Sequence, residues 1–350
     1  MTEAHDVVVV GGGQAGLGTA RALARRGVRD VVVLEAGEVG HTWTDRWDSL
    51  QLFTPRRFSG LPGRRFPRGR TRSPSRTEMA AYLRSYAADL PVREHVRVER
   101  LHRDGDGFAL QTSRGPVRAR CVVLAPGPFS RPSVPAAAAD LDVPQLHSSD
   151  YHRPSDVPPG DVLVVGGGNS AAQLSLELAR DHHVHVVAPR PLWFLPEDVL
   201  GFSTYWWTLA TGVLNAPADA RVSRYVRRRG DAIVGTQLRA LVRRGEVAVT
   251  TSRVVGASGR TVHLQDGTRL PVSCVLWCTG FRPDTAFVDV PGALDDDGAP
   301  LHVQGVSPVA GLWWMGLPWQ TRLNSSIVDG VDRDARATAD RVAAHLRPGA

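Results

Sequence analysis

Two stretches of this chain share one pattern of apolar and polar positions. Residues 6–18 read DVVVVGGGQAGLG and residues 161–173 read DVLVVGGGNSAAQ, so that an apolar run leads into three glycines and then into helix-forming residues. A continuous apolar run of this length is typical of a strand buried on both faces of a parallel sheet. The pattern predicts a strand, a tight turn and a helix in each stretch. A further strand is predicted after each helix, at residues 30–37 and 183–189.

The first glycine run has the spacing G-x-G-x-x-G. Its first glycine permits a tight turn, its second lets a pyrophosphate approach the backbone, and its third lets the helix pack on the sheet. The helix N-terminus offers free N–H groups and a positive dipole to the same anion. An acid at the end of the next strand can accept hydrogen bonds from a ribose. We therefore expect a dinucleotide site built from Gly11, Gly13, Gln14, Ala15, Gly16 and Glu35.

The second run, Gly166, Gly168 and Ala171, has the spacing G-x-G-x-x-A but lacks the acid. Ala188 stands near the place of the acid, and Arg190 follows it. An arginine there would hold a ribose 2′-phosphate that an acid would repel, so we expect NADPH rather than NADH. The alternative is that Arg190 is a surface arginine before a proline. The polar residues at the helix start that could add contacts are Asn169, Ser170 and Gln173.

Two dinucleotide sites in one chain indicate a resident FAD and a visiting nicotinamide, with hydride passing between them. The stretches at residues 118–132 and 273–284 both read as a strand ending in a glycine turn, and residues 152–160 read as a linker rich in proline. We expect an α/β fold of two Rossmann-like domains, the NADPH domain inserted into the FAD domain. The expected boundaries are 1–159 for the first part of the FAD domain, 160–272 for the NADPH domain and 273–350 for the second part.

Composition narrows the function classes. The 350 residues are 42% hydrophobic and 22% charged, which is ordinary for a globular protein of one or two domains. The formal net charge is +7 and every basic side chain other than histidine is an arginine. No nucleic-acid-binding motif accompanies the charge, so we expect no nucleic acid partner. The N-terminus has no signal-peptide pattern and no apolar run could span a bilayer, so we expect a cytoplasmic protein without a membrane partner.

Two segments outside the glycine units carry further expectations. Residues 200–231, which include GFSTYWWTLATGVLN, fit no Rossmann element and predict one or two helices, either packed on the NADPH domain or forming a lid over the substrate. The tail at 324–346 predicts a helix capped by Asn324 or Ser325, with its start beside the flavin ring or over a sheet edge. Cys274 and Cys278 lie in an apparent buried strand and are expected to be core residues.

The motifs GGGQAGLG, HTWTDRWDSLQLFTPRRFSGLPG, GGGNSAAQ, FLPEDVLG and LWCTGFRPD together resemble the class B flavin-dependent monooxygenases, and the chain is similar to their short bacterial members, such as the arsenic-resistance flavin monooxygenases. The resemblance implies bound FAD, NADPH as donor, and a flavin hydroperoxide that transfers one oxygen atom from O2 to a small-molecule substrate. It also implies a homodimer. It places Trp43 and Arg46 beside the flavin, and it places Gln51 and Thr54 where several members carry an asparagine.

One family fingerprint, F-x-G-x-x-x-H-x-x-x-(F/Y), appears here as LDVPQLHSSDY, with Leu141 and Val143 in place of phenylalanine and glycine. This departure bears on oxygen transfer more than on nucleotide binding. The alternative function is therefore an NADPH-dependent flavin oxidoreductase that inserts no oxygen. A disulfide reductase would need a cysteine pair, which neither residues 40–67 nor the second domain before Cys274 provides. A nucleotide sensor would need only one of the two sites.

Overall fold

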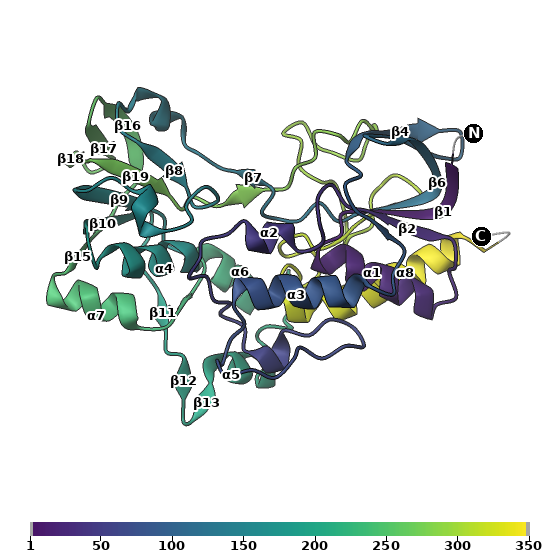
Figure 1. Cartoon of the computed structure of the whole chain (residues 1–350), viewed down its shortest axis with the longest axis horizontal. Helices are drawn as coiled ribbons and strands as arrows, with labels where there is room; N and C mark the ends of the chain where they lie inside the picture. The colour runs from purple at the N-terminus through teal and green to yellow at the C-terminus, as the bar shows by residue number, and fades with distance from the viewer. Residues whose placement is uncertain (1–2, 348–350) are drawn as a thin grey trace.

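Parallel sheets form where the sequence has its apolar runs. The computed structural model describes residues 3–347 and contains two α/β units side by side (Figure 1). The sheet of the first unit has the order β3-β2-β1-β6-β5-β4, and β21 pairs with β6. Its strands are β1 (Glu3–Val10), β2 (Val31–Leu34), β3 (Val92–Arg93), β4 (Val98–Asp104), β5 (Gly107–Thr112), β6 (Gly115–Leu124) and β21 (Leu312–Trp314).

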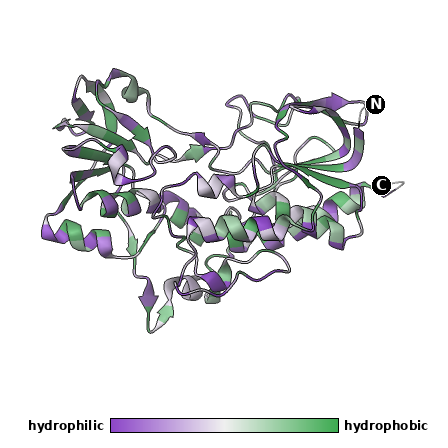
Figure 2. Cartoon of the chain, viewed as in Figure 1, coloured by the Kyte–Doolittle hydropathy of each residue, from purple (hydrophilic) through white to green (hydrophobic). Residues whose placement is uncertain are grey.

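The core of the first unit follows from the strand pattern. Successive side chains of a strand point to opposite faces, so Val7 and Val9 pack against the helices while Val8 and Val10 pack against the loops around residues 288–317. Figure 1 shows helices along one side of this sheet, and Figure 2 shows that the central strands are coloured as hydrophobic while the helices alternate between hydrophobic and hydrophilic residues. These helices are α1 (Gln14–Arg25), α3 (Arg76–Ala87) and α8 (Val331–His345).

The second unit has an all-parallel sheet of the order β15-β10-β9-β19-β8. Its strands are β8 (Gln145–His147), β9 (Asp161–Val165), β10 (His183–Ala188), β15 (Val247–Thr251) and β19 (Cys274–Trp277). One face packs on α4 (Asn169–Leu178) and α7 (Gln237–Arg244), and the other on the antiparallel strands β16 (Val254–Ser258), β17 (Thr261–Leu264) and β18 (Arg269–Pro271). Two Rossmann-like units were predicted, and this fold class is confirmed.

The second sheet extends beyond the predicted range of 160–272 at both ends. β8 precedes that range and β19 follows it, yet both pair into the second sheet beside β9. The reason is that the apolar run CVLW of β19 needs burial on both faces, and the place beside β9 provides it. The proline-rich stretch at 152–160 connects β8 to β9 within the second unit.

Two crossing segments join the units. β7 (Arg131–Pro132) runs out of the first unit and β20 (Phe281–Arg282) returns to it, and the two pair antiparallel. Each follows the glycine turn that ends a central strand, β6 or β19. The sequence pattern predicted this pair of turns as a repeat, and the structure places them side by side (Figure 1).

The segment at 200–231 contains two helices, α5 (Thr204–Ala210) and α6 (Arg221–Arg229), as predicted. The start of this segment also forms a hairpin that was not predicted. Its strands are β12 (Asp198–Val199) and β13 (Phe202–Ser203), and the hairpin projects from the molecule in Figure 1. A short parallel pair, β11 (Phe194–Leu195) and β14 (Ile233–Val234), closes the segment at its base.

The predicted start of the last helix is wrong. α8 begins at Val331 after Gly330, and neither Asn324 nor Ser325 caps it. Ser325 Oγ instead accepts hydrogen bonds from the backbone N–H groups of Thr321 and Arg322, both at 3.0 Å, because a serine side chain can bond a nearby turn as readily as a helix end. The remaining short helices are α2 (His41–Thr44), η1 (Arg56–Phe58), η2 (Ala136–Asp140), η3 (Pro154–Asp156) and η4 (Val328–Gly330).

Candidate functional site

The first glycine turn connects β1 to α1 and has one position open to a ligand. Gly11 has φ +106°, and a Cβ on it would lie 2.3 Å from the carbonyl oxygen of Ala125. A Cβ on Gly16 would lie 1.8 Å from the carbonyl oxygen of Gly11. A Cβ on Gly13, in contrast, would meet no atom within 4 Å. Two of the glycines are therefore required by the fold, and Gly13 faces space that an anion can fill.

Glu35 holds this turn from the end of β2. Its carboxylate accepts hydrogen bonds from the N–H of Gly12 at 2.6 Å and the N–H of Gly37 at 2.9 Å, and the side chain is 7% exposed. The first turn of α1 contains no acid and no side-chain cap, so its N–H groups keep their capacity for a phosphate. These features fit a dinucleotide at the place that the sequence predicted.

The residues that open α1 contact the tail of the chain. Gln14 Nε2 donates to the carbonyl oxygen of Ser326 at 3.2 Å, and Ala15 packs against Gly316, where a Cβ would lie 2.6 Å from that of Ala15. Gly18 meets Val331 at the start of α8 in the same way. The sequence placed the tail beside the flavin, and its residues do lie at the N-terminus of the first nucleotide helix.

The second glycine turn repeats the geometry of the first. Gly166 has φ +146°, and its Cβ would lie 2.3 Å from the carbonyl oxygen of Cys278, the counterpart of Ala125. A Cβ on Gly168 would meet no atom within 4 Å, and α4 begins without an acid or a side-chain cap. The start of α4 therefore has the same open glycine and free N–H groups as the start of α1, and it can hold a second phosphate.

Asn169 has a structural contact that the sequence did not predict. Its amide donates to the carbonyl oxygen of Ala232 at 3.0 Å and accepts from the N–H of Val234 at 2.9 Å, so both ends of the side chain hold the strand β14. Ser170 is half-buried beside it. Arg190 is exposed just after β10, and one of its guanidinium nitrogens lies 3.7 Å from the position of a Cβ on Gly230, at the end of the basic helix α6.

Trp43 and Arg46 lie close together in the chain but have different neighbours. Trp43 in α2 is half-buried against the core of the first unit. The guanidinium of Arg46 lies 4.7 Å from the centre of the Phe281 ring and donates to the carbonyl oxygen of Phe129 at 3.2 Å. Its burial lowers the pKa of Arg46. Because Phe129 and Phe281 belong to the two closing turns, Arg46 contacts both crossings between the units.

Gln51 and Thr54 occupy different environments. Gln51 is exposed and lines a cleft of about 340 Å³ between the two units, where its backbone carbonyl oxygen accepts a hydrogen bond from Gln173 Nε2 at 3.1 Å. Thr54 is 2% exposed. Further members of the cleft lining come from both units and include Phe53, Leu176, Glu177, Tyr205 and Val234.

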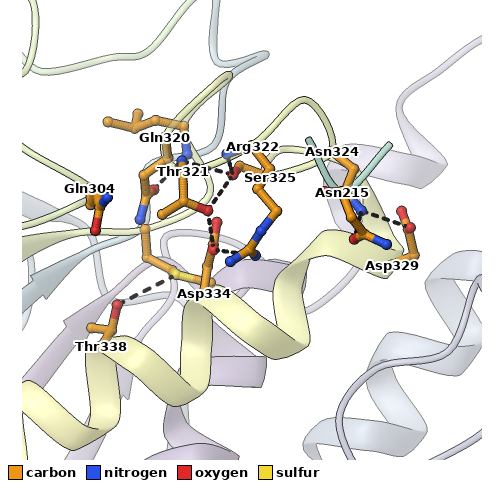
Figure 3. Close-up of polar contacts among 12 residues, drawn as sticks. Asn215, Gln304, Gln320, Thr321, Arg322, Asn324, Ser325, Asp329, Asp334 and Thr338 are labelled. Atoms are coloured by element: carbon orange, nitrogen blue, oxygen red, sulfur yellow. Dashed lines mark hydrogen bonds and ion pairs between the residues drawn. The ribbon is translucent and has the colours of Figure 1, made fainter. Parts of the chain in front are cut away.

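A buried polar group lies behind the cleft. Asn324 is 1% exposed, its Nδ2 donates to Asp329 Oδ2 at 2.9 Å, and it lies 3.5 Å from Asn215 Oδ1 (Figure 3). The other oxygens of Asn324 and Asp329, and the hydroxyl of Tyr205, make no hydrogen bond of good geometry with any residue in the range 3–347. Burial raises the pKa of Asp329 and the pKa of Tyr205. Asp329 raises the pKa of Tyr205 further, whereas Thr54 lowers it. The side chains of Asp329 and Thr54 therefore both lie near the phenol of Tyr205.

Unpartnered buried polar atoms are rare in folded proteins and need an explanation. Three such atoms here come from α5 and from the turn before α8, and they meet close to the N-terminus of α1. A polar ligand that binds at this place would satisfy them. The sequence predicted that Asn324 would lie beside the flavin, but as the cap of a helix. Tyr205, Asp329 and Asn215 were missed.

Comparison with known proteins agrees with this geometry. Residues 8–200 match the family described as Pyridine nucleotide-disulphide oxidoreductase. A CzcO-like oxidoreductase of Geobacillus kaustophilus is 35% identical over 344 residues, which cover 97% of this chain and 99% of that protein. The chain belongs to the pyridine nucleotide-disulphide oxidoreductases.

Within this family of oxidoreductases the predicted class B flavin monooxygenase type is confirmed. A flavin-containing monooxygenase from Stenotrophomonas maltophilia is 28% identical, has a TM-score of 0.83, and matches over 99% of this chain and 100% of that chain. A probable indole-3-pyruvate monooxygenase, YUCCA1 of Arabidopsis thaliana, is 29% identical over 217 residues, or 57% of this chain and 51% of that protein. The chain is therefore a flavoprotein oxidoreductase with flavin and nicotinamide cofactors.

The cysteines of this chain are not suited to the disulfide exchange that the name of the family mentions. All three cysteines are free. Burial raises the pKa of Cys274 to about 11 and that of Cys278 to about 12, which leaves no thiolate for disulfide exchange at neutral pH. The fingerprint departures are also explained by packing, since Leu141 and Val143 are buried in the core between the second sheet and β16–β18. Within residues 3–347, no helix is long and apolar enough to cross a membrane.

Proposed function

We propose that this chain binds FAD at the first glycine turn and NADPH at the second, and that it transfers one oxygen atom of O2 to a small-molecule substrate. The observation that carries the proposal is the pair of open cradles at Gly13 and Gly168, combined with the unpartnered buried polar atoms of Tyr205, Asn324 and Asp329. The flavin, when bound, supplies the chemistry that activates O2. The other product is water, and NADPH is oxidised to NADP+.

In this proposal each unit has its own task. The first sheet, with the tail that returns to it, holds FAD through the N-terminus of α1 and the turn that Glu35 fixes. The second sheet holds NADPH, and Arg190 binds the ribose 2′-phosphate from the end of β10. The arginines of α6 end close to Arg190 and add positive charge on the same side.

The substrate enters by the cleft between the units in this proposal. Tyr205 supports this, because it both lines the cleft and carries one of the unpartnered polar atoms. Asp329 lies at the same place, and burial raises the pKa of its carboxyl. Thr54 neighbours the phenol of Tyr205 and is closed off from solvent, while Gln51 stands at the cleft rim.

The test uses isotopic oxygen and a thioether probe, methyl phenyl sulfide. The purified protein is incubated with NADPH under 18O2, and the product is analysed by mass spectrometry. Labelled sulfoxide in an amount that follows NADPH consumption supports oxygen transfer. Consumption of NADPH with all the label in hydrogen peroxide, for this probe and for a ketone and an amine probe, would instead support a flavin oxidoreductase. Heat release and chromatography of the bound cofactor distinguish FAD from FMN.

A further inference from the structure

The hairpin β12–β13 carries a leucine in a backbone conformation that leucine disfavours. Val199 pairs with Phe202, so that the connecting loop consists of Leu200 and Gly201 alone. Leu200 has φ +52° and Gly201 has φ +78°, the signs of a type I′ turn, in which asparagine followed by glycine is preferred. Leu200 is 84% exposed, so no packing compensates for its strain. Backbone strain that no contact within the fold offsets indicates that the residue has a functional role, such as contact with another molecule.

The surroundings of Leu200 make an apolar tip. Phe202 is 54% exposed and Val199 is 40% exposed. Phe202 stacks on Trp206 with ring centroids 5.1 Å apart, and Trp207 donates from its indole N–H to the carbonyl oxygen of Val199 at 2.8 Å. The tip therefore stands on a rigid aromatic base at the start of α5, and Figure 1 shows it projecting beyond the rest of the molecule.

A loop rich in arginine is attached to the hairpin by an ion pair. In the loop at 56–72, Arg56 and Arg72 form ion pairs with Glu78 and Asp198. The pair of Arg72 with Asp198 attaches this loop to the hairpin itself, and Phe58 packs on Tyr205 of α5 with ring centroids 5.4 Å apart. Five other arginines of this loop are exposed and form no ion pair with any described residue: Arg57, Arg64, Arg65, Arg68 and Arg70.

We propose that the hairpin tip and this arginine loop together dock the protein onto an anionic lipid bilayer, a partner that the sequence did not lead us to expect. An exposed apolar patch with a polar rim marks an interaction site. Here the apolar part is small, convex and projecting, which suits insertion between lipid headgroups, and the unpaired arginines suit the negative charge of the lipids. A second copy of the chain fits less well, because a two-fold contact through this face would bring the arginine loops of both copies together.

The experiment measures cosedimentation of the full-length protein with vesicles. Vesicles of phosphatidylcholine are compared with vesicles that contain about one third phosphatidylserine, the anionic component that attracts arginines. Leu200→Asn removes the apolar tip but suits the turn, so the melting temperature is expected to hold or rise while vesicle binding falls about tenfold. Arg68→Glu/Arg70→Glu is expected to weaken binding to the anionic vesicles by at least about tenfold and to make it less sensitive to salt.

Matched controls separate this surface from general charge and hydrophobicity. Val303→Asn changes an apolar residue that is 77% exposed beside another tight turn, and Arg239→Glu/Arg243→Glu reverses two exposed arginines on α7. Neither control is expected to change vesicle binding. The proposal is overturned if the protein ignores anionic vesicles, or if the controls reduce binding as much as the test variants. Self-association that Leu200→Asn abolishes, without vesicle binding, would assign the tip to a second copy instead.

Discussion

Alanine at Gly13 is expected to weaken flavin binding while leaving the fold intact, whereas alanine at Gly16 is expected to damage the fold. Gly13 has φ −77° and ψ −175°, which any residue can adopt, and a Cβ there meets no atom within 4 Å. A Cβ on Gly16 would lie 1.8 Å from the carbonyl oxygen of Gly11, which belongs to the backbone and cannot move aside. The two variants thus separate a glycine needed by a ligand from one needed by packing.

The magnitudes follow from these contacts. At Gly13, alanine restricts the unfolded chain and is expected to stabilise the protein without cofactor by about 0.4–1 kcal/mol. At Gly16, overpacking is expected to cost about 1–3 kcal/mol or more. A methyl group in the Gly13 cradle displaces the pyrophosphate, and loss of one charge-assisted hydrogen bond, worth about 1.5–3 kcal/mol, raises the Kd for FAD by roughly 10-fold to 150-fold.

The assay is titration of cofactor-free protein with FAD, followed by flavin fluorescence, beside thermal melts of the same samples. Gly168→Ala is the matched variant in the second turn, and it should keep FAD affinity while weakening NADPH binding by a similar factor. The reasoning is refuted if Gly13→Ala binds FAD as well as the parent protein, or if its cofactor-free form melts as low as that of Gly16→Ala.

Four further outcomes are expected. Arg190→Ala should lower the preference for NADPH over NADH by roughly tenfold or more, since the contact is worth about 1.5–3 kcal/mol; steady-state kinetics with both donors measures it. Tyr205→Phe removes a buried hydroxyl without a partner, so the melting temperature should not fall, while product formed per NADPH should. Burial raises the pKa of Asp329, so its contribution to stability is complete below the ordinary aspartate pKa and is lost as pH rises through the folded value; Asp329→Asn should remove this part of the pH dependence in urea unfolding. Without substrate, NADPH oxidation should release hydrogen peroxide, because Gln51 is exposed and only Thr54 is shielded, and a peroxide assay would contradict this if release is negligible.

The glycine turns could be predicted from the sequence because their chemistry is local. A strand, three glycines and a helix follow one another within residues 3–25, and each glycine has a steric reason that the pattern itself implies. Glu35 is predictable for the same reason, since it ends the strand beside β1. The extent of the second sheet was less predictable, because β8 and β19 join it through pairing between residues far apart in the chain.

The buried polar group could not be predicted from a motif. Thr54, Tyr205 and Asp329 come from three separate segments, and only the fold brings them together. One signal was present: residues 200–231 are apolar and aromatic yet fit no element of a dinucleotide unit. Asn324 illustrates the opposite case, in which a residue at the right place was given the wrong role because a polar residue before a helix resembles a cap.

The duplicated turn gives the two proposed nucleotide sites a structural connection. Gly11 lies against the carbonyl of Ala125, and Gly166 lies against that of Cys278, so each cradle rests on the turn that closes its own unit. Those turns lead directly into β7 and β20, which pair with each other. Arg46 contacts an aromatic residue of each turn. In the proposed function, paired backbone and one guanidinium therefore connect the two cradles, and these contacts would set the distance between the two cofactors.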